Sequence, residues 1–267
     1  MGEDAHTPAG QETGAPVRGL RDRPPGLRGD LSLTLDSIQL DALEFTLAVE
    51  RAYAVLVAFG AGAAEEPSLG GKLLYAGELN AGGRALMVAG NISGAATLAA
   101  TADSAAGKQA MRDGVTDFLV NSLDEGLRIL KNEVRKRETV AVCIGTDPGA
   151  VEAEMQERGV VADLLVPEAL PELAPEMVIV CWQVAAAPAQ WLPKVDAIAM
   201  ECVEKAGEVG IGAARRWLRQ APRYLGRMSQ GLRVMRCEAR VADAFAARVR
   251  AAVAGGEIGV EVNAVTR

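Results

Sequence analysis

The chain has 267 residues, of which 49% are hydrophobic, and it carries a formal net charge of −7. This composition predicts a folded protein with a sizeable core. It contains no apolar run of the roughly 18 residues that span a bilayer and no apolar signal-peptide core, so we expect a cytoplasmic protein with no membrane association. The only histidine, His6, and four cysteines without CxxC spacing argue against His-based catalytic triads and zinc sites, so we predict no metal site.

The N-terminal third contains few predicted elements. Residues 1–30 are rich in Gly, Pro, Arg and acidic residues, which predicts a disordered tail. Residues 31–80 are predicted to form an N-terminal helix and a loop. Apolar residues recur at helical spacing between Asp36, a capping residue, and Gly60. The loop after this helix holds one short apolar stretch at 73–75, a candidate strand.

Residues 81–190 alternate between strand-like and helix-like segments. The predicted strands are near-continuous apolar runs at 84–89, 117–120, 139–144, 160–166 and 177–182. Helices are predicted from the turn at 90–95 to Arg112, from Ser122, which forms a capping box with Glu125, and from Asp147 to Gly159. This alternation predicts an α/β fold with a Rossmann-like parallel sheet and helices on both faces.

The C-terminal residues 191–267 are predicted to form a helical extension. Helical segments are expected over 194–229, followed by a returning unit with a strand at 232–237 and a helix over 241–253. A short strand at 260–262 is expected near the end of the chain.

The turn at 90–95 lies between a predicted strand and a predicted helix, where free amides at a helix N-terminus can face an anion. Its pattern, GxxxGA, differs from the dinucleotide pattern GxGxxG, so close packing of strand and helix is an alternative explanation of its glycines. Five residues of this turn are predicted to bind a cofactor phosphate: Gly90, Asn91, Ser93, Gly94 and Ala95.

Three groups of segments share a pattern with a known family. They are Gly83–Gly90 with Ser93-Gly94-Ala95 and Leu98–Thr101, the Leu123–Leu127 helix start, and Ile144-Gly145 with Glu157-Arg158-Gly159 and Val161–Leu164. Together these segments resemble the central domain of urocanase. The resemblance implies bound NAD⁺, which in that family acts as an electrophile, and hence lyase or hydratase chemistry on a small polar substrate. Departures from the family leave open a non-catalytic remnant that acts as a partner subunit or scaffold. The glycine loop is shorter, and there is no room for a second strand between Thr101 and Gly114.

Ligands of open parallel sheets bind beyond the carboxyl ends of the strands. This rule adds Ser122, Thr146 and Asp147 as cofactor-binding candidates, although Ser122 and Asp147 are also good helix caps. Glu168 follows a predicted strand and is the catalytic acid–base candidate, with a solvated loop carboxylate as the alternative. Trp182 and Gln183 are substrate candidates that could stack on a planar ligand, with core packing as the alternative.

The last third of the chain is basic. Eleven basic and three acidic residues lie between positions 205 and 250, and Trp217 and Tyr224 are interleaved with arginines. This pattern suggests a nucleic-acid binder as a third hypothesis, but the acidic whole chain favours a solvated helix face. We therefore expect the partners to be a small-molecule ligand or a second protein chain, in a homo-oligomer, rather than nucleic acid.

Overall fold

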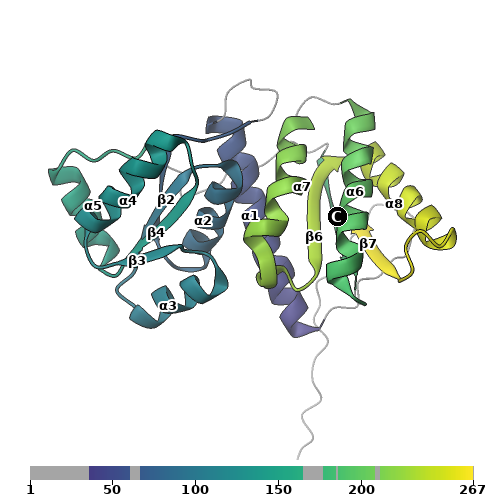
Figure 1. The fold of residues 1–267 in the computed structure, drawn as a ribbon, viewed down its shortest axis with the longest axis horizontal. Coiled ribbons are helices and arrows are strands. Elements are labelled where there is room, and N and C mark those ends of the chain that lie inside the picture. The colour runs from purple at the N-terminus through teal and green to yellow at the C-terminus, as the bar shows by residue number, and fades with distance from the viewer. Residues whose placement is uncertain (1–35, 61–66, 165–176, 185, 208–210, 267) are drawn as a thin grey trace, which may run out of the picture. The chain divides into compact units, whose positions relative to one another are not determined.

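A computed structural model describes residues 36–60, 67–164, 177–184, 186–207 and 211–266. Its first sheet is parallel and has four strands in the order β1-β2-β4-β3 (Figure 1). The strands are β1 (Leu73–Glu78), β2 (Ala96–Ala100), β3 (Phe118–Val120) and β4 (Val140–Ile144). Beyond the outer edge of β1, Leu164 pairs with Leu74 in a parallel bridge.

Helices cover both faces of this sheet, because alternate strand residues point to opposite sides. Leu98 and Val142 pack with residues of α4 (Leu123–Lys136) and α5 (Pro148–Glu157), whereas Ala99 and Cys143 belong to the core that contains α2 (Ala81–Ser93). The helix between β2 and β3 is α3 (Ser104–Asp113), whose Ala110 lies in the same core as α2. The predicted Rossmann-like sheet with helices on both faces is therefore confirmed.

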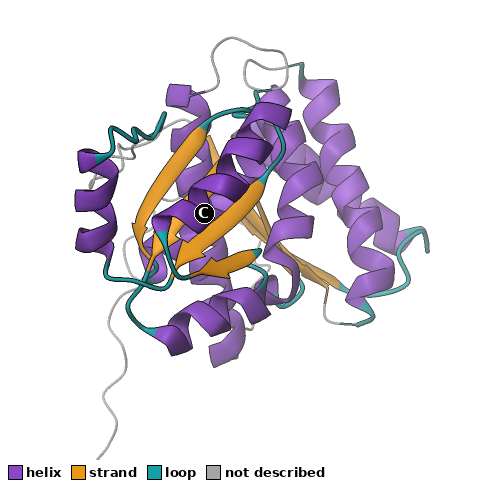
Figure 2. Ribbon diagram, turned by 60° about the vertical axis from the view of Figure 1, so that its left-hand side comes forward, coloured by secondary structure: helices purple, strands orange, loops and turns teal. Residues whose placement is uncertain are grey.

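A second, antiparallel sheet has three strands in the order β6-β5-β7. Figure 2 shows the strands, in orange, lying among the helices. They are β5 (Met177–Val184), β6 (Leu232–Glu238) and β7 (Val262–Thr266), and the accompanying helices are α6 (Pro188–Ala206), α7 (Ile211–Leu225), a 3₁₀ turn (Gly226–Ser229) and α8 (Ala239–Ala254). The long helix α1 (Ser37–Gly60) contacts both α2 and β6. One hydrophobic core thus continues from the parallel sheet through α1 to the antiparallel sheet.

Over residues 84–100 the predicted secondary structure is wrong, because helix and strand are exchanged. The predicted strand at 84–89 is part of α2, and the helix predicted after the 90–95 turn begins instead with β2. Every residue from Met87 to Ser93 is buried, so α2 has no polar face there to reveal a helical period. The residues of β2 are buried too, and its alanine content mimics a helix.

The other predicted elements are found close to their expected positions. They include α1, the strands β1, β3, β4, β5 and β6, and the helices α4, α5 and α8. Of the strand expected at 160–166, residues 160–164 are described, and among them Leu164 forms a bridge; the strand expected at 260–262 begins at Val262. None of the described helices combines the length and the apolar character needed to cross a bilayer.

Candidate functional site at the carboxyl edge of the parallel sheet

The turn at 90–95 is the C-terminus of α2, not the N-terminus of a helix. Gly94 adopts φ 94°, and its amide and that of Ala95 donate to the carbonyls of Asn91 and Gly90 at 3.0 and 2.9 Å. The guanidinium of Arg216 donates from Nε to the Ile92 carbonyl at 2.8 Å. These are the contacts of a helix C-terminus, where the dipole is negative and favours cations. The structural premise of a phosphate cradle here is therefore wrong.

The side chains of this turn lie in the core. Asn91 accepts a hydrogen bond from Thr97 Oγ1 at 3.3 Å, and Ser93 Oγ donates to the Ala89 carbonyl at 2.8 Å. A Cβ atom at Gly90 would lie 2.5 Å from Thr97 Cγ2 and 2.7 Å from Leu74 Cδ2. Gly90 thus allows close packing of α2 on the sheet, which was the alternative explanation of this glycine.

The first strand–helix turn of the sheet is instead Gly77–Gly83, between β1 and α2. Asn80 is the N-cap of α2 and accepts a hydrogen bond from the Gly83 amide at 3.0 Å. A Cβ atom at Gly83 would collide with the carbonyl oxygen of Glu78, so only glycine permits this approach of helix to strand. The amides of Ala81 and Gly82 have no acceptor within the described part of the chain. Sequence reasoning missed this turn, although Gly77, Asn80 and the Gly82-Gly83 pair mark it.

Hydrogen bonds join the carboxyl ends of the four strands into one edge. The Leu79 amide donates to Ala100 O, the Thr101 amide to Ile144 O and the Gly145 amide to Val120 O, at 2.9, 3.0 and 2.8 Å. β2 continues into α3 on one face and its neighbour β4 into α5 on the other. A doubly wound sheet places its ligand crevice at such a switch point. Thr146 and Asp147 follow β4 at this switch point, and Ser122 follows the next strand, β3.

The polar side chains at this edge are largely engaged in helix capping. Ser122 Oγ accepts from the Glu125 amide at 3.3 Å, and Asp147 Oδ1 accepts from the Ala150 amide at 3.1 Å. Asp103 caps α3 through Oδ1, which accepts from the Ala105 and Ala106 amides at 2.8 and 3.2 Å. Asp103 Oδ2 has no partner among the described residues and remains able to accept a hydrogen bond.

Tyr75 of β1 lies close to this edge on the α5 side. Burial, followed by the carboxylates of Glu152 and Asp147, raises the pKa of its phenol above the ordinary range. Its buried hydroxyl makes no hydrogen bond that meets normal geometry. Tyr75 therefore stays protonated at neutral pH, where its hydroxyl can donate a hydrogen bond and accept one.

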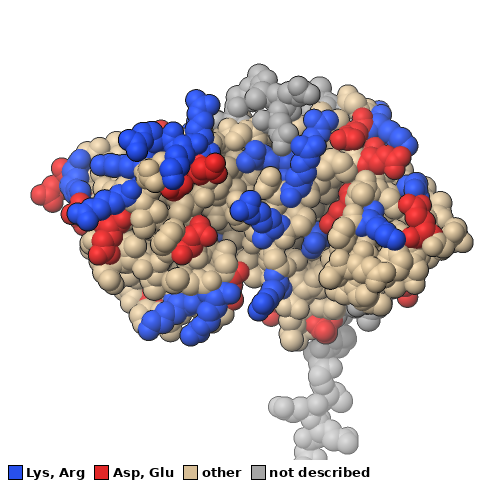
Figure 3. Space-filling model, viewed as in Figure 1, with Lys and Arg blue, Asp and Glu red and all other residues tan. Residues whose placement is uncertain are grey.

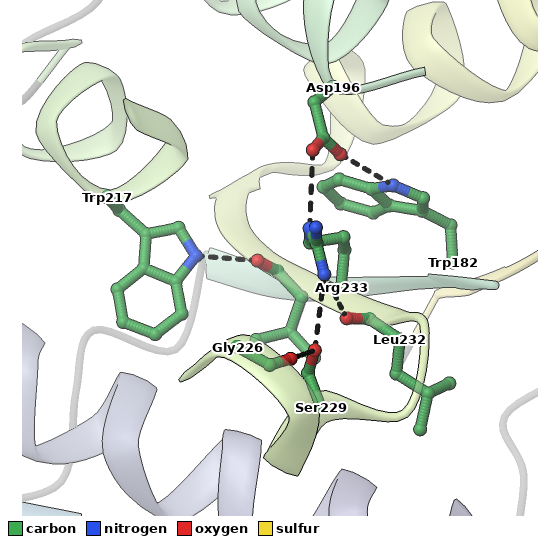
Figure 4. A network of polar contacts seen from close by, with 8 residues as sticks. Trp182, Asp196, Trp217, Gly226, Ser229, Leu232 and Arg233 are labelled. Atoms are coloured by element: carbon green, nitrogen blue, oxygen red, sulfur yellow. Dashed lines mark hydrogen bonds and ion pairs between the residues drawn. The ribbon is translucent and has the colours of Figure 1, made fainter. Parts of the chain in front are cut away.

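The predicted substrate residues do not lie at this edge. Trp182 and Gln183 belong to β5 of the antiparallel sheet and are 0% and 4% exposed. The Trp182 ring packs on Phe245 with centroids 5.0 Å apart, and its Nε1 donates to Asp196 Oδ1 at 3.2 Å (Figure 4). Their assignment to the carboxyl end of the parallel sheet is therefore wrong. Glu168, the catalytic candidate, lies outside the described residues, and the described part of the chain holds no group of three or more potential metal ligands.

Comparison with known families agrees with the fold. Residues 48–168 match the sequence model of the urocanase Rossmann-like domain. This match confirms the resemblance inferred from the sequence and extends it toward the N-terminus, so that it includes β1 and the Gly77–Gly83 turn. It covers slightly less than half of the chain, and α6 to α8 lie beyond it. No curated protein matches the chain.

Proposed function

We propose that the chain binds NAD⁺ or a related nucleotide at the carboxyl edge of its parallel sheet. The observation that carries this proposal is the arrangement of β1, the Gly77–Gly83 turn, α2, β2 and Asp103. In dinucleotide-binding folds the first strand–helix turn receives the pyrophosphate, and an acidic residue about 20 positions later, at the end of the next strand, receives the ribose. Asp103 follows Gly83 at this spacing and lies in the turn after β2, the strand paired with β1, where it caps α3.

The phosphate part of the proposed site is the N-terminus of α2. The Ala81 and Gly82 amides point away from the helix as donors, and the first turn of α2 contains no acidic residue. A phosphate group there would meet the positive end of the helix dipole. Gly82 has room beside it, because a Cβ atom at this position would come no closer than 3.4 Å to Asn80 Oδ1.

The ribose part is Asp103, held by α3. Two amides fix its Oδ1, so the orientation of the carboxylate is set before any ligand arrives. The remaining oxygen, Oδ2, can accept hydrogen bonds from ribose hydroxyls. A hydrogen bond to a charged acceptor of this kind contributes about 1.5–3 kcal/mol of stabilisation.

The chemistry that the resemblance implies is a lyase or hydratase reaction on a small polar substrate. NAD⁺, when bound, would supply an electrophilic ring, and Tyr75 could donate a proton or hydrogen bond nearby. However, the described carboxylates Asp103 and Asp147 each use one oxygen to cap a helix, α3 and α5 respectively. This observation favours, as a second candidate, a non-catalytic nucleotide-binding subunit that works with another chain.

The basic helix α7 does not favour nucleic-acid binding. Arg216 is bonded to the end of α2, Arg215 lies 3.6 Å from Glu204, and the Arg223 guanidinium lies 5.3 Å from the Tyr224 ring centroid. In Figure 3, acidic side chains are spread among the basic ones on the visible face. These arginines therefore have structural partners within the fold.

The proposal is tested by calorimetric titration with NAD⁺, after denatured protein has been assayed for released dinucleotide. Gly82→Glu places a carboxylate in the turn and should abolish binding, whereas the matched control Gly82→Ala should bind normally. Asp103→Asn keeps a good helix cap but removes the charge, and should weaken binding by about 10- to 100-fold. The proposal fails if the wild type neither contains nor binds a nucleotide, or if Gly82→Glu binds as tightly as wild type. If the wild type binds the nucleotide, an assay for turnover of urocanate or a similar unsaturated acid distinguishes the two candidates: turnover indicates the enzyme, and its absence favours the non-catalytic subunit.

A further inference from the structure

A separate apolar cavity of about 240 Å³ lies between α1, α7 and the antiparallel sheet. No residue of the Gly77–Gly83 turn lines it. Its walls are mainly aliphatic and aromatic, and include Ala54 and Val57 of α1, Trp217 of α7 and Val241 of α8. An apolar cavity of about 150 Å³ is already large enough to bind benzene. This cavity has room for a substituted ring.

One wall of the cavity carries a buried ion pair. Arg236 donates from Nε to Glu50 Oε1 at 2.8 Å and from Nη2 to Glu50 Oε2 at 2.6 Å. The Glu50 side chain is 3% exposed and that of Arg236 is 18% exposed. The third guanidinium nitrogen, Nη1, has no partner among the described residues. In an otherwise apolar wall, this nearly buried pair therefore leaves both N–H groups of Arg236 Nη1 without an acceptor among the described residues.

The aromatic part of the wall is held in place by its own contacts. Tyr53 Oη donates to the Ala213 carbonyl at 2.7 Å, and the Tyr53 and Trp217 rings pack with centroids 5.2 Å apart. Trp217 Nε1 donates to the Val234 carbonyl at 2.6 Å. Because both rings are anchored through their polar atoms, they offer a preformed apolar surface.

We infer that this cavity binds a small, uncharged aromatic molecule with one hydrogen-bond acceptor, such as an aryl ketone. Its ring lies against Trp217 and Val57, and its acceptor meets Arg236 Nη1. An anionic ligand is disfavoured, because Glu50 already neutralises Arg236 and would repel a second carboxylate. A hydrocarbon fills the same space but leaves Nη1 without an acceptor.

Three probes of similar size distinguish these possibilities in calorimetric titrations. Acetophenone should bind and raise the melting temperature, isopropylbenzene should bind about tenfold more weakly, and benzoate should not bind. The inference is overturned if acetophenone does not bind, or if benzoate or isopropylbenzene binds as well as acetophenone.

Two matched variants locate the site. Ala54→Phe fills the cavity and should abolish acetophenone binding, whereas Ala48→Phe, at an exposed position of the same helix, should leave binding unchanged. NAD⁺ affinity should be the same in both variants, so this test is independent of the proposed nucleotide site. Unaltered acetophenone binding by a folded Ala54→Phe protein would also refute the assignment.

Discussion

Replacing Arg233 with methionine should destabilise the protein strongly at neutral pH and only weakly in mild acid. Arg233 and Asp196 form an ion pair at 3.2 Å, and both side chains are 15% exposed. Arg233 also donates from Nη1 to the Leu232 carbonyl and Ser229 Oγ, at 3.0 and 3.3 Å (Figure 4). The substitution leaves the Asp196 carboxylate with Trp182 Nε1 as its one remaining described donor.

The expected loss follows from the cost of a buried charge without its partner. Removing one member of a buried ion pair typically costs about 3–5 kcal/mol in the free energy of unfolding. Methionine keeps most of the side-chain volume, so little of this loss comes from a cavity. We therefore expect about 3 kcal/mol at pH near 8, the lower end of the range, because Trp182 still donates to Asp196.

The pH dependence follows from the pKa of Asp196. Burial raises this pKa, and Arg233 opposes the rise through its charge and its hydrogen bond. Without Arg233 the folded-state pKa rises further above the unfolded value, so the folded variant binds a proton more tightly than the unfolded chain. Protonation thus favours folding at low pH, and this contribution is lost as pH rises through the folded pKa, by at most about 1.4 kcal/mol per pH unit.

Urea unfolding of wild type and Arg233→Met between about pH 5 and pH 8 measures the effect. The difference in unfolding free energy should shrink as the pH falls. In an Asp196→Asn background the charge is absent, so the further loss caused by Arg233→Met should be smaller at about pH 8 and independent of pH. A loss of the same size at every pH in the single variant would refute the reasoning, because it would assign the effect to packing alone.

Three further results are expected. Gly83→Ala should lower the unfolding free energy by about 2 kcal/mol or more in thermal or urea denaturation, whereas Gly82→Ala should change it by less than about 0.5 kcal/mol, because only the first clashes with the backbone. Ser122→Ala should cost about 1 kcal/mol through the lost cap of α4 and leave NAD⁺ affinity unchanged. Burial raises the pKa of the Cys143 thiol to about 11 and also raises the pKa of the Cys202 thiol. Iodoacetamide should therefore leave Cys143 unmodified in the native protein, and it should modify the partly exposed Cys202 slowly, at a rate that increases with pH. Rapid modification of Cys143 would contradict its burial.

Elements with clear end signals were predictable from the sequence. The capping box of Ser122 and Glu125 and the Asp147-Pro148 start fixed α4 and α5, because caps act through local hydrogen bonds that do not depend on tertiary contacts. The antiparallel pairing of β5 with β6 and β7 could not be foreseen in this way. It joins Cys181 to Val234 and Val265, residues far apart in the chain, and no local pattern specifies such a pairing.

The candidate site was displaced because the meaning of a glycine depends on which element precedes it. Gly94 after an assumed strand suggests a phosphate turn, but after the helix α2 it is a left-handed C-cap. Once α2 is recognised as a helix, β1 becomes the strand before the glycine turn, and Asp103 lies in the turn after the adjacent strand β2. The second strand that the sequence pattern lacked is then present, and its acidic residue stands about 20 positions after the glycines. The assignment of residues 81–93 to a helix therefore rules out a phosphate site at the 90–95 turn, and it also supports the phosphate site proposed at the Gly77–Gly83 turn.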